Sequence, residues 1–254
     1  MIVKTLAVPL AVHPYAGTSR VVHWFTRQHG KVSTLLKGAF RPRRNPFAGG
    51  YQLFATSELL YRPGRTADRL YPAVECALVR PRDVFRVHWR RMLAASYFTA
   101  LLLRLLPEEA PDPDLFTLFE ELLDFAAECG DDPAFLPWAE MRFCAALGHA
   151  PNFQACGGCG VTSGHFAFNA AAGGVLCSDC AAHAESALLA LPPDLLDLLR
   201  RWQGSDLPPR IRDVRLSPAR RAALDAVLEQ FLLHQFRLPP RIRRAALAPR
   251  RRPS

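Results

Sequence analysis

The sequence predicts an α+β protein: an N-terminal five-stranded β-barrel, followed by an α-helical domain that carries a four-cysteine segment. Three observations predict this class. Short runs rich in valine, aromatic and other apolar residues, separated by glycine and proline, fill the first part of the chain. From Pro81 onward the apolar residues recur at helical spacing. Two Cys-x-x-Cys pairs then interrupt the helical pattern between Cys156 and Cys180.

The N-terminal segments have the length and punctuation of strands in a small closed barrel. A turn signal lies at Gln28–Lys31, and a proline-broken basic loop at Arg41–Pro46. An OB-fold fits the number and length of the strands, although the pattern alone leaves their topology open. The expected strands are Ile2–Val12, Ser19–Thr26, Val32–Phe40, Tyr51–Tyr61 and Leu70–Leu78.

The barrel region carries charge of only one sign. Residues 1–57 contain no Asp or Glu, within a chain whose formal net charge is +9. Such a stretch indicates a field directed at an anion, and the alternative is a basic face without a specific partner. OB barrels bind single strands through a cationic groove and exposed aromatic rings. The candidate nucleic-acid-binding residues are Arg20, Arg27, Lys31, Lys37, Arg41, Arg43 and Arg44.

Aromatic residues of the barrel are candidates for stacking on bases. Most aromatic side chains of a small barrel fill its interior, so each of them is expected in the core more often than on a binding surface. The candidates are Tyr15, Trp24, Phe40, Tyr51, Phe54 and Tyr61.

Helical periodicity and charge describe the rest of the chain. Between Glu108 and Asp132 there are ten acids and no bases, which indicates a solvated helix face, a protein-docking surface, or a segment that neutralises the basic barrel. The segment Arg237–Ser254 has seven arginines and no acids, and we expect a frayed arm that adds phosphate affinity. Helices are expected over Val84–Leu106, Asp114–Cys129, Asp132–Leu147, Pro192–Trp202 and Ser217–Phe236.

The four cysteines Cys156, Cys159, Cys177 and Cys180 follow the pattern C-x2-C-x17-C-x2-C. This spacing is typical of a zinc site, and four thiolates complete a closed structural shell around one zinc ion. The alternative is two disulfides, or thiols that never meet, and it requires a secreted protein. His165 or His183 could replace one thiolate. The other cysteines, Cys76, Cys129 and Cys144, are expected to be small buried hydrophobes.

Several classes of protein lack support in the sequence. No apolar run is long enough to span a membrane, the N-terminus lacks a signal-peptide core, and the odd number of cysteines fits a reducing cytoplasm. P-loop, nucleophile-elbow and zinc-deaminase motifs are absent, so the residues favour a binding protein over an enzyme. Two alternatives stay open: a zinc-ribbon scaffold for proteins, and a nucleic-acid enzyme with an unrecognised centre.

Two groups of segments resemble the bacterial RecO family of DNA-repair and recombination mediators. The first is a Thr-x-x-x-Gly-Lys turn that leads into a basic Lys-Gly-x-x-Arg strand and loop. The second joins a Trp-containing helix to the cysteine pairs. The segments are Val21–Lys31, Leu36–Arg44, Trp138–Gly148, Pro151, Cys156–Gly160, Phe166–Phe168 and Gly173–Cys180.

The resemblance implies a function for the whole chain. It implies binding to single- and double-stranded DNA, annealing of complementary strands, and work with RecR in loading RecA onto strands coated by single-strand-binding protein. It also implies that the helical domain binds the acidic, apolar C-terminal tail of that coating protein, and Arg142 is the candidate contact. The alternative for Arg142 is a salt bridge with Glu140 or a neighbour. A cytoplasmic, nucleoid-associated protein that does not bind membranes is expected.

The expected division of the chain follows these features. It comprises an OB-fold nucleic-acid-binding domain at 1–80, the helical domain in two parts at 81–150 and 183–240, the four-cysteine zinc segment at 151–182, and a flexible basic tail at 241–254.

Overall fold

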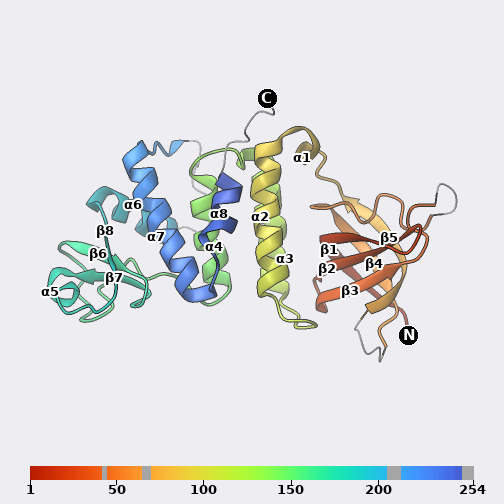
Figure 1. Ribbon diagram of the computed structural model, residues 1–254, viewed down its shortest axis with the longest axis horizontal. Helices are drawn as coiled ribbons and strands as arrows, with labels where there is room; N and C mark the ends of the chain where they lie inside the picture. The colour runs from red at the N-terminus through yellow and green to blue at the C-terminus, as the bar shows by residue number, and fades with distance from the viewer. Residues whose placement is uncertain (42–44, 65–69, 205–212, 248–254) are drawn as a thin grey trace. The chain divides into compact units, whose positions relative to one another are not determined.

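A computed structural model describes residues 1–41, 45–64, 70–204 and 213–247. The chain divides into two compact units, Met1–Glu128 and Cys129–Ser254. Figure 1 shows the barrel and two long helices in the first unit, and short strands with further helices in the second.

The first unit begins with a closed five-stranded barrel in the order β1-β2-β3-β5-β4. Strand β3 runs parallel to β5, and the other neighbours are antiparallel. This order closes the sheet and gives the OB-type barrel expected from the sequence. The strands are β1 (Val3–Tyr15), β2 (Ser19–Thr26), β3 (Gly30–Leu36), β4 (Thr56–Tyr61) and β5 (Leu70–Arg80).

Apolar side chains from all five strands fill the barrel. Trp24 is fully buried there, and its indole N–H donates to the Thr34 hydroxyl at 2.8 Å. The expectation that most of the barrel's aromatic rings are core is confirmed for Trp24, Phe54 and Tyr61, whereas Tyr15 and Phe40 are exposed. The barrel core includes Ala7, Val22, Trp24, Val32, Leu36, Phe47, Leu59, Tyr61 and Tyr71.

Two of the expected strands are shorter than their apolar pattern suggested. Strand β3 ends at Leu36, because Gly38 turns the chain with φ +73°. Strand β4 starts only at Thr56, after Phe54 with φ +69°. Asn45 satisfies two backbone groups of the loop between them, since its side chain donates to Ala39 O and accepts from Phe47 N. Side-chain bonds of this kind let an apolar segment leave the sheet.

Three helices complete the first unit: α1 (Val84–Val87), α2 (Trp89–Leu105) and α3 (Pro113–Cys129), whose last residue lies in the second unit. The expected single helix from Val84 to Leu106 is broken at His88, which has φ −110° and ψ 84°. Phe25 of the barrel packs edge-on against Phe116 of α3, with ring centroids 5.4 Å apart. The barrel and α3 therefore share an apolar contact.

The acidic stretch meets the barrel at this contact. Arg82, almost fully buried, donates to Asp124 at 2.7 Å and to Phe54 O at 2.8 Å. Glu120 accepts a hydrogen bond from Thr56 at 2.6 Å. Asp124 and Glu120 therefore contact the barrel end, as expected if the acidic segment neutralises the barrel.

The second unit combines a small sheet with helices. The sheet has the order β7-β6-β8, and Phe168 of β6 packs against Phe153 and Phe231, which joins the sheet to α7. Its elements are α4 (Phe135–Ala146), β6 (Phe166–Asn169), β7 (Gly174–Cys177), α5 (Ser178–Ala181), β8 (Leu188–Ala190), α6 (Pro193–Gln203), α7 (Pro218–Phe236) and α8 (Pro240–Leu247).

The expectation of a frayed basic tail from Arg237 is wrong for Pro240–Leu247, which form helix α8. Arg243 of this helix is 1% exposed, and its Nε donates to both carboxylate oxygens of Glu140 at 2.8 and 3.0 Å. Its Nη1 donates to Asp225 at 2.8 Å. Burial opposes the charge, but the two carboxylates raise the pKa of Arg243 above its ordinary value. These bonds hold α8 against the other helices of the second unit. The charge of the sequence alone predicts a solvated arm there.

Candidate metal centre and nucleic-acid interface

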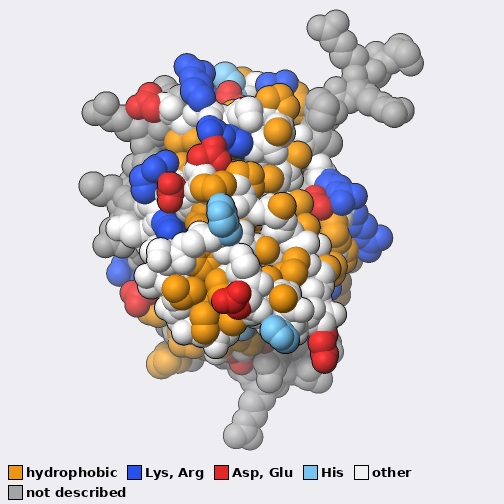
Figure 2. Space-filling model, turned by 90° about the vertical axis from the view of Figure 1, so that its left-hand side faces the viewer, with side chains coloured by type: hydrophobic (Ala, Val, Ile, Leu, Met, Phe, Trp, Pro, Cys, Tyr) orange, Lys and Arg blue, Asp and Glu red, His pale blue; other side chains and the backbone are white. Residues whose placement is uncertain are grey.

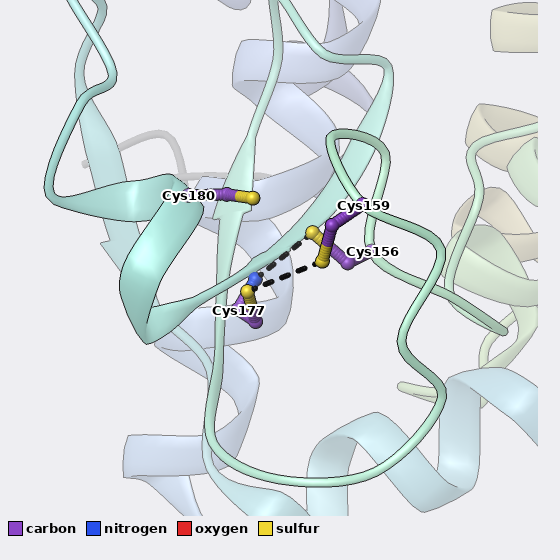
Figure 3. Close-up of side chains that lie close together, drawn as sticks. All are labelled: Cys156, Cys159, Cys177 and Cys180. Carbon is purple, nitrogen blue, oxygen red and sulfur yellow. Dashed lines mark hydrogen bonds between the residues drawn. The ribbon is translucent and has the colours of Figure 1, made fainter.

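The four cysteines of the two knuckles meet at one point in the second unit. The sulfurs of Cys156, Cys159, Cys177 and Cys180 all lie within 4.8 Å of one another. Figure 3 shows the side chains converging from the first knuckle and from the end of β7 with the following helix α5. The distance between the Cys159 and Cys177 sulfurs is 3.7 Å, longer than a disulfide bond of about 2.05 Å. The arrangement can hold a metal ion.

The backbone around the first knuckle is shaped for this cluster. Backbone N–H groups of Gly158 and Cys177 donate to the Cys156 sulfur at 3.4 and 3.3 Å. A Cβ atom at Gly158 would lie 2.8 Å from the Cys180 sulfur, so only glycine leaves room for that sulfur. Neither His165 nor His183 belongs to the cluster, and His183 Nδ1 lies 2.9 Å from Asp179 O.

The thiols differ in acidity. The backbone N–H of Cys177 lowers the pKa of Cys156 to about 6, assisted by the N–H groups of Cys159 and Gly158. Hydrogen bonds with the sulfurs of Cys156, Cys159 and Cys177 raise the pKa of Cys180 to about 12. Four thiolates this close together repel one another unless a cation lies between them. The donor set therefore fits a closed tetrathiolate site.

Helices α6 and α7 support the cysteine module, here defined as residues 151–190. Arg200 of α6 donates to Phe153 O at 2.8 Å and to Thr162 O at 3.1 Å. Its guanidinium carbon lies 5.4 Å from the centre of the Phe166 ring. Together with the Phe168–Phe231 contact, these interactions connect the cysteine-bearing loops to the helices.

The cysteine module differs from the barrel in charge. No Lys or Arg occurs from Phe143 to Leu199, although Asp179 and Glu185 lie within the module. Figure 2 looks onto the side of the molecule where β6, β7 and α5 are seen in Figure 1, and Lys and Arg gather toward its top and sides. Phosphate contact depends on Lys and Arg, so this module is a poor surface for nucleic acid.

Three of the expected DNA-binding residues come together at one end of the barrel. The guanidinium carbon of Arg20 lies 5.1 Å from the centre of the Phe40 ring, which is 68% exposed. Phe40 N donates to Thr18 O at 2.9 Å, which ties the turn after β3 to the β1–β2 turn. Lys37 and Arg41 of the same turn are exposed. We name Arg20, Lys37, Phe40 and Arg41 the barrel-end patch.

None of the three cations of the barrel-end patch has a carboxylate within salt-bridge distance among the residues that the structure describes. The β1–β2 turn and the outer face of β2–β3 are the regions through which OB-folds bind oligonucleotides. The patch combines uncompensated positive charge with an exposed ring, which suits contact with phosphates and bases.

The other candidates lie elsewhere. Arg27 is exposed but follows the opposite end of β2 from Arg20. The Lys31 side chain is 11% exposed, and its Nζ contacts Leu103 O at 3.1 Å and Glu108 at 3.2 Å. Lys31 therefore holds the barrel to the helices, and we do not include it in an interface. Arg43 and Arg44 lie outside the described residues.

Arg142, the candidate for partner binding, lies on α4 in the second unit and is partly exposed. Most of the residues around it on α4 are buried. Its neighbour Glu140 is bound by Arg243 through both carboxylate oxygens. The structure leaves a partner role for Arg142 as a prediction.

One group of exposed cations was not singled out from the sequence. Arg86 and Arg90 flank the break between α1 and α2, and the guanidinium carbon of Arg90 lies 5.3 Å from the centre of the Trp89 ring. A sequence signal existed, because no Asp or Glu occurs between Val84 and Pro107. The helical spacing of the apolar residues in this segment predicts its packing and not its exposed cations.

None of the helices within the described ranges is both long and apolar enough to cross a membrane.

Comparison with known proteins gives two family matches. The family described as "Recombination protein O N terminal" matches residues 1–82, and "Recombination protein O C terminal" matches residues 86–244. The chain is similar to the DNA repair protein RecO of Symbiobacterium thermophilum, with 32% identity over 231 residues and 89% of each chain covered. It is also 32% identical to the protein of that name from Anaeromyxobacter sp. strain K, with 91% of each chain covered.

Proposed function

The chain belongs to the RecO family of DNA repair proteins, and from this membership we propose that it is a non-enzymatic recombination mediator. It binds single- and double-stranded DNA and anneals complementary strands. With RecR, it helps to load RecA onto strands coated by single-strand-binding protein.

The observation that carries this proposal is the barrel-end patch. Arg20, Lys37 and Arg41 have no carboxylate within salt-bridge distance in the described part of the chain, so their charge is available to phosphates. Annealing requires that both backbones be neutralised and that the bases stay free to pair. Cations that contact phosphates and an exposed ring that stacks on bases without reading their edges meet that requirement.

The partners are proposed on the family resemblance. The C-terminal tail of single-strand-binding protein is acidic and apolar, and the helical second unit is its proposed docking place, with Arg142 as one contact. RecR is the proposed partner in loading. The proposed location is the cytoplasm, in association with the nucleoid.

We also propose that the four cysteines bind one structural zinc ion. Four thiolates that lie within 4.8 Å of one another match the tetrahedral shell that zinc prefers, with Zn–S distances of about 2.3 Å. All four positions are cysteine, so no coordination position is left for a reactive water. The metal stabilises the module and takes no part in a reaction.

The test is a titration of labelled oligonucleotide across a range of salt concentrations, followed by a gel for products. We expect binding whose log–log salt slope is about −0.7 per phosphate contact on single strands, and an intact oligonucleotide. Lys37→Glu/Arg41→Glu should lower the affinity at low salt about a hundredfold without unfolding the chain. Arg62→Glu/Arg104→Glu is the matched control, because both side chains are exposed and the change in net charge is the same.

Other results would point to other functions. Equal affinity for the two double variants would remove the barrel-end patch from the interface. Weak binding without salt dependence in the natural chain would favour a zinc-ribbon scaffold for proteins. Cleaved or modified oligonucleotide would indicate an enzyme.

A further inference from the structure

The break between α1 and α2 exposes a second group of cations in the first unit. His88 departs from helical geometry, and Val87 beside it is 76% exposed although it is apolar. Arg86 and Arg90 on either side of the break are also exposed. We name residues 86–90 the elbow.

The charge of the elbow is hardly compensated. Arg86 lies 3.5 Å from Asp83, but both side chains are about two-thirds exposed, and such a pair contributes little in water. Within the described part of the chain, no carboxylate lies within salt-bridge distance of Arg90. By contrast, Arg82, only four residues before Arg86, is bound to Asp124 at 2.7 Å. Arg82 is therefore part of the folded core, whereas Arg86 and Arg90 keep most of their charge exposed to solvent.

The elbow also offers an aromatic surface. The Arg90 guanidinium lies over the Trp89 ring, which orients its planar group while its N–H donors stay in water. A stacked arginine can donate to a phosphate or stack in turn on a base. An inorganic anion would use the charge alone, whereas a nucleic-acid strand uses the charge, the planar stack and the apolar Val87 together.

The elbow is separate from the barrel-end patch. Arg20 and Lys37 lie at the end of β2–β3 remote from Phe25 and Lys31, which contact α3 and α2. The elbow instead follows β5, where Arg80 is bound to Asp124 of α3 at 2.8 Å. In Figure 1, α1 lies where β5 leads into the helices. A strand bound at one patch therefore leaves the other patch free.

From these observations we infer that the elbow is a second nucleic-acid-binding surface, which holds the second strand during annealing. The inference rests on the proposed function, since it assigns a place to the second of two strands. Two polyanions repel each other, and separate cationic surfaces on one unit lower the cost of bringing them together.

The experiment compares two charge reversals on the same helix. Arg90→Glu changes the elbow, and Arg104→Glu is the matched control, because Arg104 is also exposed and unpaired with any described carboxylate. Annealing of two complementary oligonucleotides is measured at low salt, together with the affinity for one oligonucleotide alone. We expect Arg90→Glu to slow annealing at least about tenfold while the affinity for the first strand changes less than about threefold. Arg104→Glu should stay within about twofold of the natural chain in both measurements.

The outcomes separate the elbow from the proposed function. If the natural chain anneals the oligonucleotides and both variants slow annealing equally, the elbow is not a binding surface, and the proposal for the barrel-end patch still holds. A natural chain that neither binds nor anneals oligonucleotides would overturn the proposed function itself. If polyglutamate competes with the labelled oligonucleotide as well as unlabelled DNA does, the elbow binds an acidic protein. That result would also overturn the inference. If Arg90→Glu lowers the melting temperature, Arg90→Gln replaces it. Arg90→Lys keeps the charge but not the planar group, and should restore only part of the rate.

Discussion

The barrel end and the cysteine module use opposite chemistries within one chain. The barrel end leaves Arg20, Lys37 and Arg41 without carboxylate partners among the described residues and exposes the Phe40 ring beside them. The cysteine module lies in a stretch without Lys or Arg, and its four sulfurs converge on one point. On the proposed function, the first region meets a polyanion, and the second holds its own loops together around a metal ion.

The difference also appears in how each unit uses its ion pairs. In the first unit, acids of α3 and of the loop before it bind cations at the helix-facing end of the barrel. Among the described residues, they leave Arg20, Lys37 and Arg41 at the far end without a carboxylate partner. In the second unit, a basic segment folds back and buries Arg243 against Glu140. A high density of arginine therefore indicates a binding surface only where the arginines are not paired with carboxylates.

Removal of the metal should have the largest effect. Cys177→Ser should abolish the binding of about one zinc per chain and destabilise the second unit by more than about 5 kcal/mol, since structural zinc supplies about 10–16 kcal/mol in zinc-finger peptides. Metal analysis and urea unfolding measure this. Cys129→Ser, a cysteine outside the cluster, is the control and should keep the zinc. If Cys177→Ser loses DNA affinity together with the zinc, the cysteine module is part of the DNA interface. The contrast between the two regions would then be wrong.

The second-largest loss of stability is expected from breaking the buried ion pair between Arg243 and Glu140. Arg243→Ala leaves Glu140 buried without its partner, and we expect a loss of about 3–5 kcal/mol in the free energy of unfolding. Arg244→Ala, the next residue on α8, removes a pair whose arginine is 69% exposed and should cost less than about 1 kcal/mol. Urea unfolding compares the two variants. A loss below about 1 kcal/mol in both variants would show that the chain does not need α8 for stability.

The contact of the barrel with the helices can be tested at Gly30. This residue has φ +67°, and an added Cβ would clash with the backbone of Ala110. Gly30→Ala should therefore destabilise the first unit by about 2–4 kcal/mol, of which the left-handed backbone accounts for about 1–2. Gly17→Ala has nearly the same φ, +63°, with nothing within 4 Å, and isolates the backbone part. Identical melting temperatures would mean that the barrel does not need this contact.

The smallest effect is expected from separating stacking and charge at the barrel end. Phe40→Ala should lower single-strand affinity about fivefold and leave the salt slope unchanged, because it removes a stacking surface and no charge. Lys37→Gln should instead reduce the slope by about 0.7. Both side chains are exposed, so neither change should alter the melting temperature. A slope that falls in Phe40→Ala would contradict the assignment of the ring to bases.

Much of this architecture could be predicted from the sequence, because it follows from local patterns. Alternation and turns indicated the five strands, and the spacing of Cys156 to Cys180 indicated the cluster without any knowledge of the fold. The strand ends at Leu36 and Thr56 were missed, since they depend on the turn at Gly38 and on the bonds made by Asn45.

The assignment of individual cations could not be predicted from local patterns. Lys31 and Lys37 look alike in the sequence. Tertiary contacts with Leu103 O and Glu108, far along the chain, remove Lys31 from the surface. The same applies to Arg243, whose partners Glu140 and Asp225 come from two other helices. A charge pattern gives the sign of a region, and the fold decides which of its charges are free.

Hydrogen exchange with and without a single-stranded oligonucleotide tests the central claim most directly. The account predicts slower exchange in residues 15–20 and 36–41 of the zinc-loaded chain, with no change in residues 156–180. Protection confined to residues 156–180, with the barrel end unchanged, would contradict it.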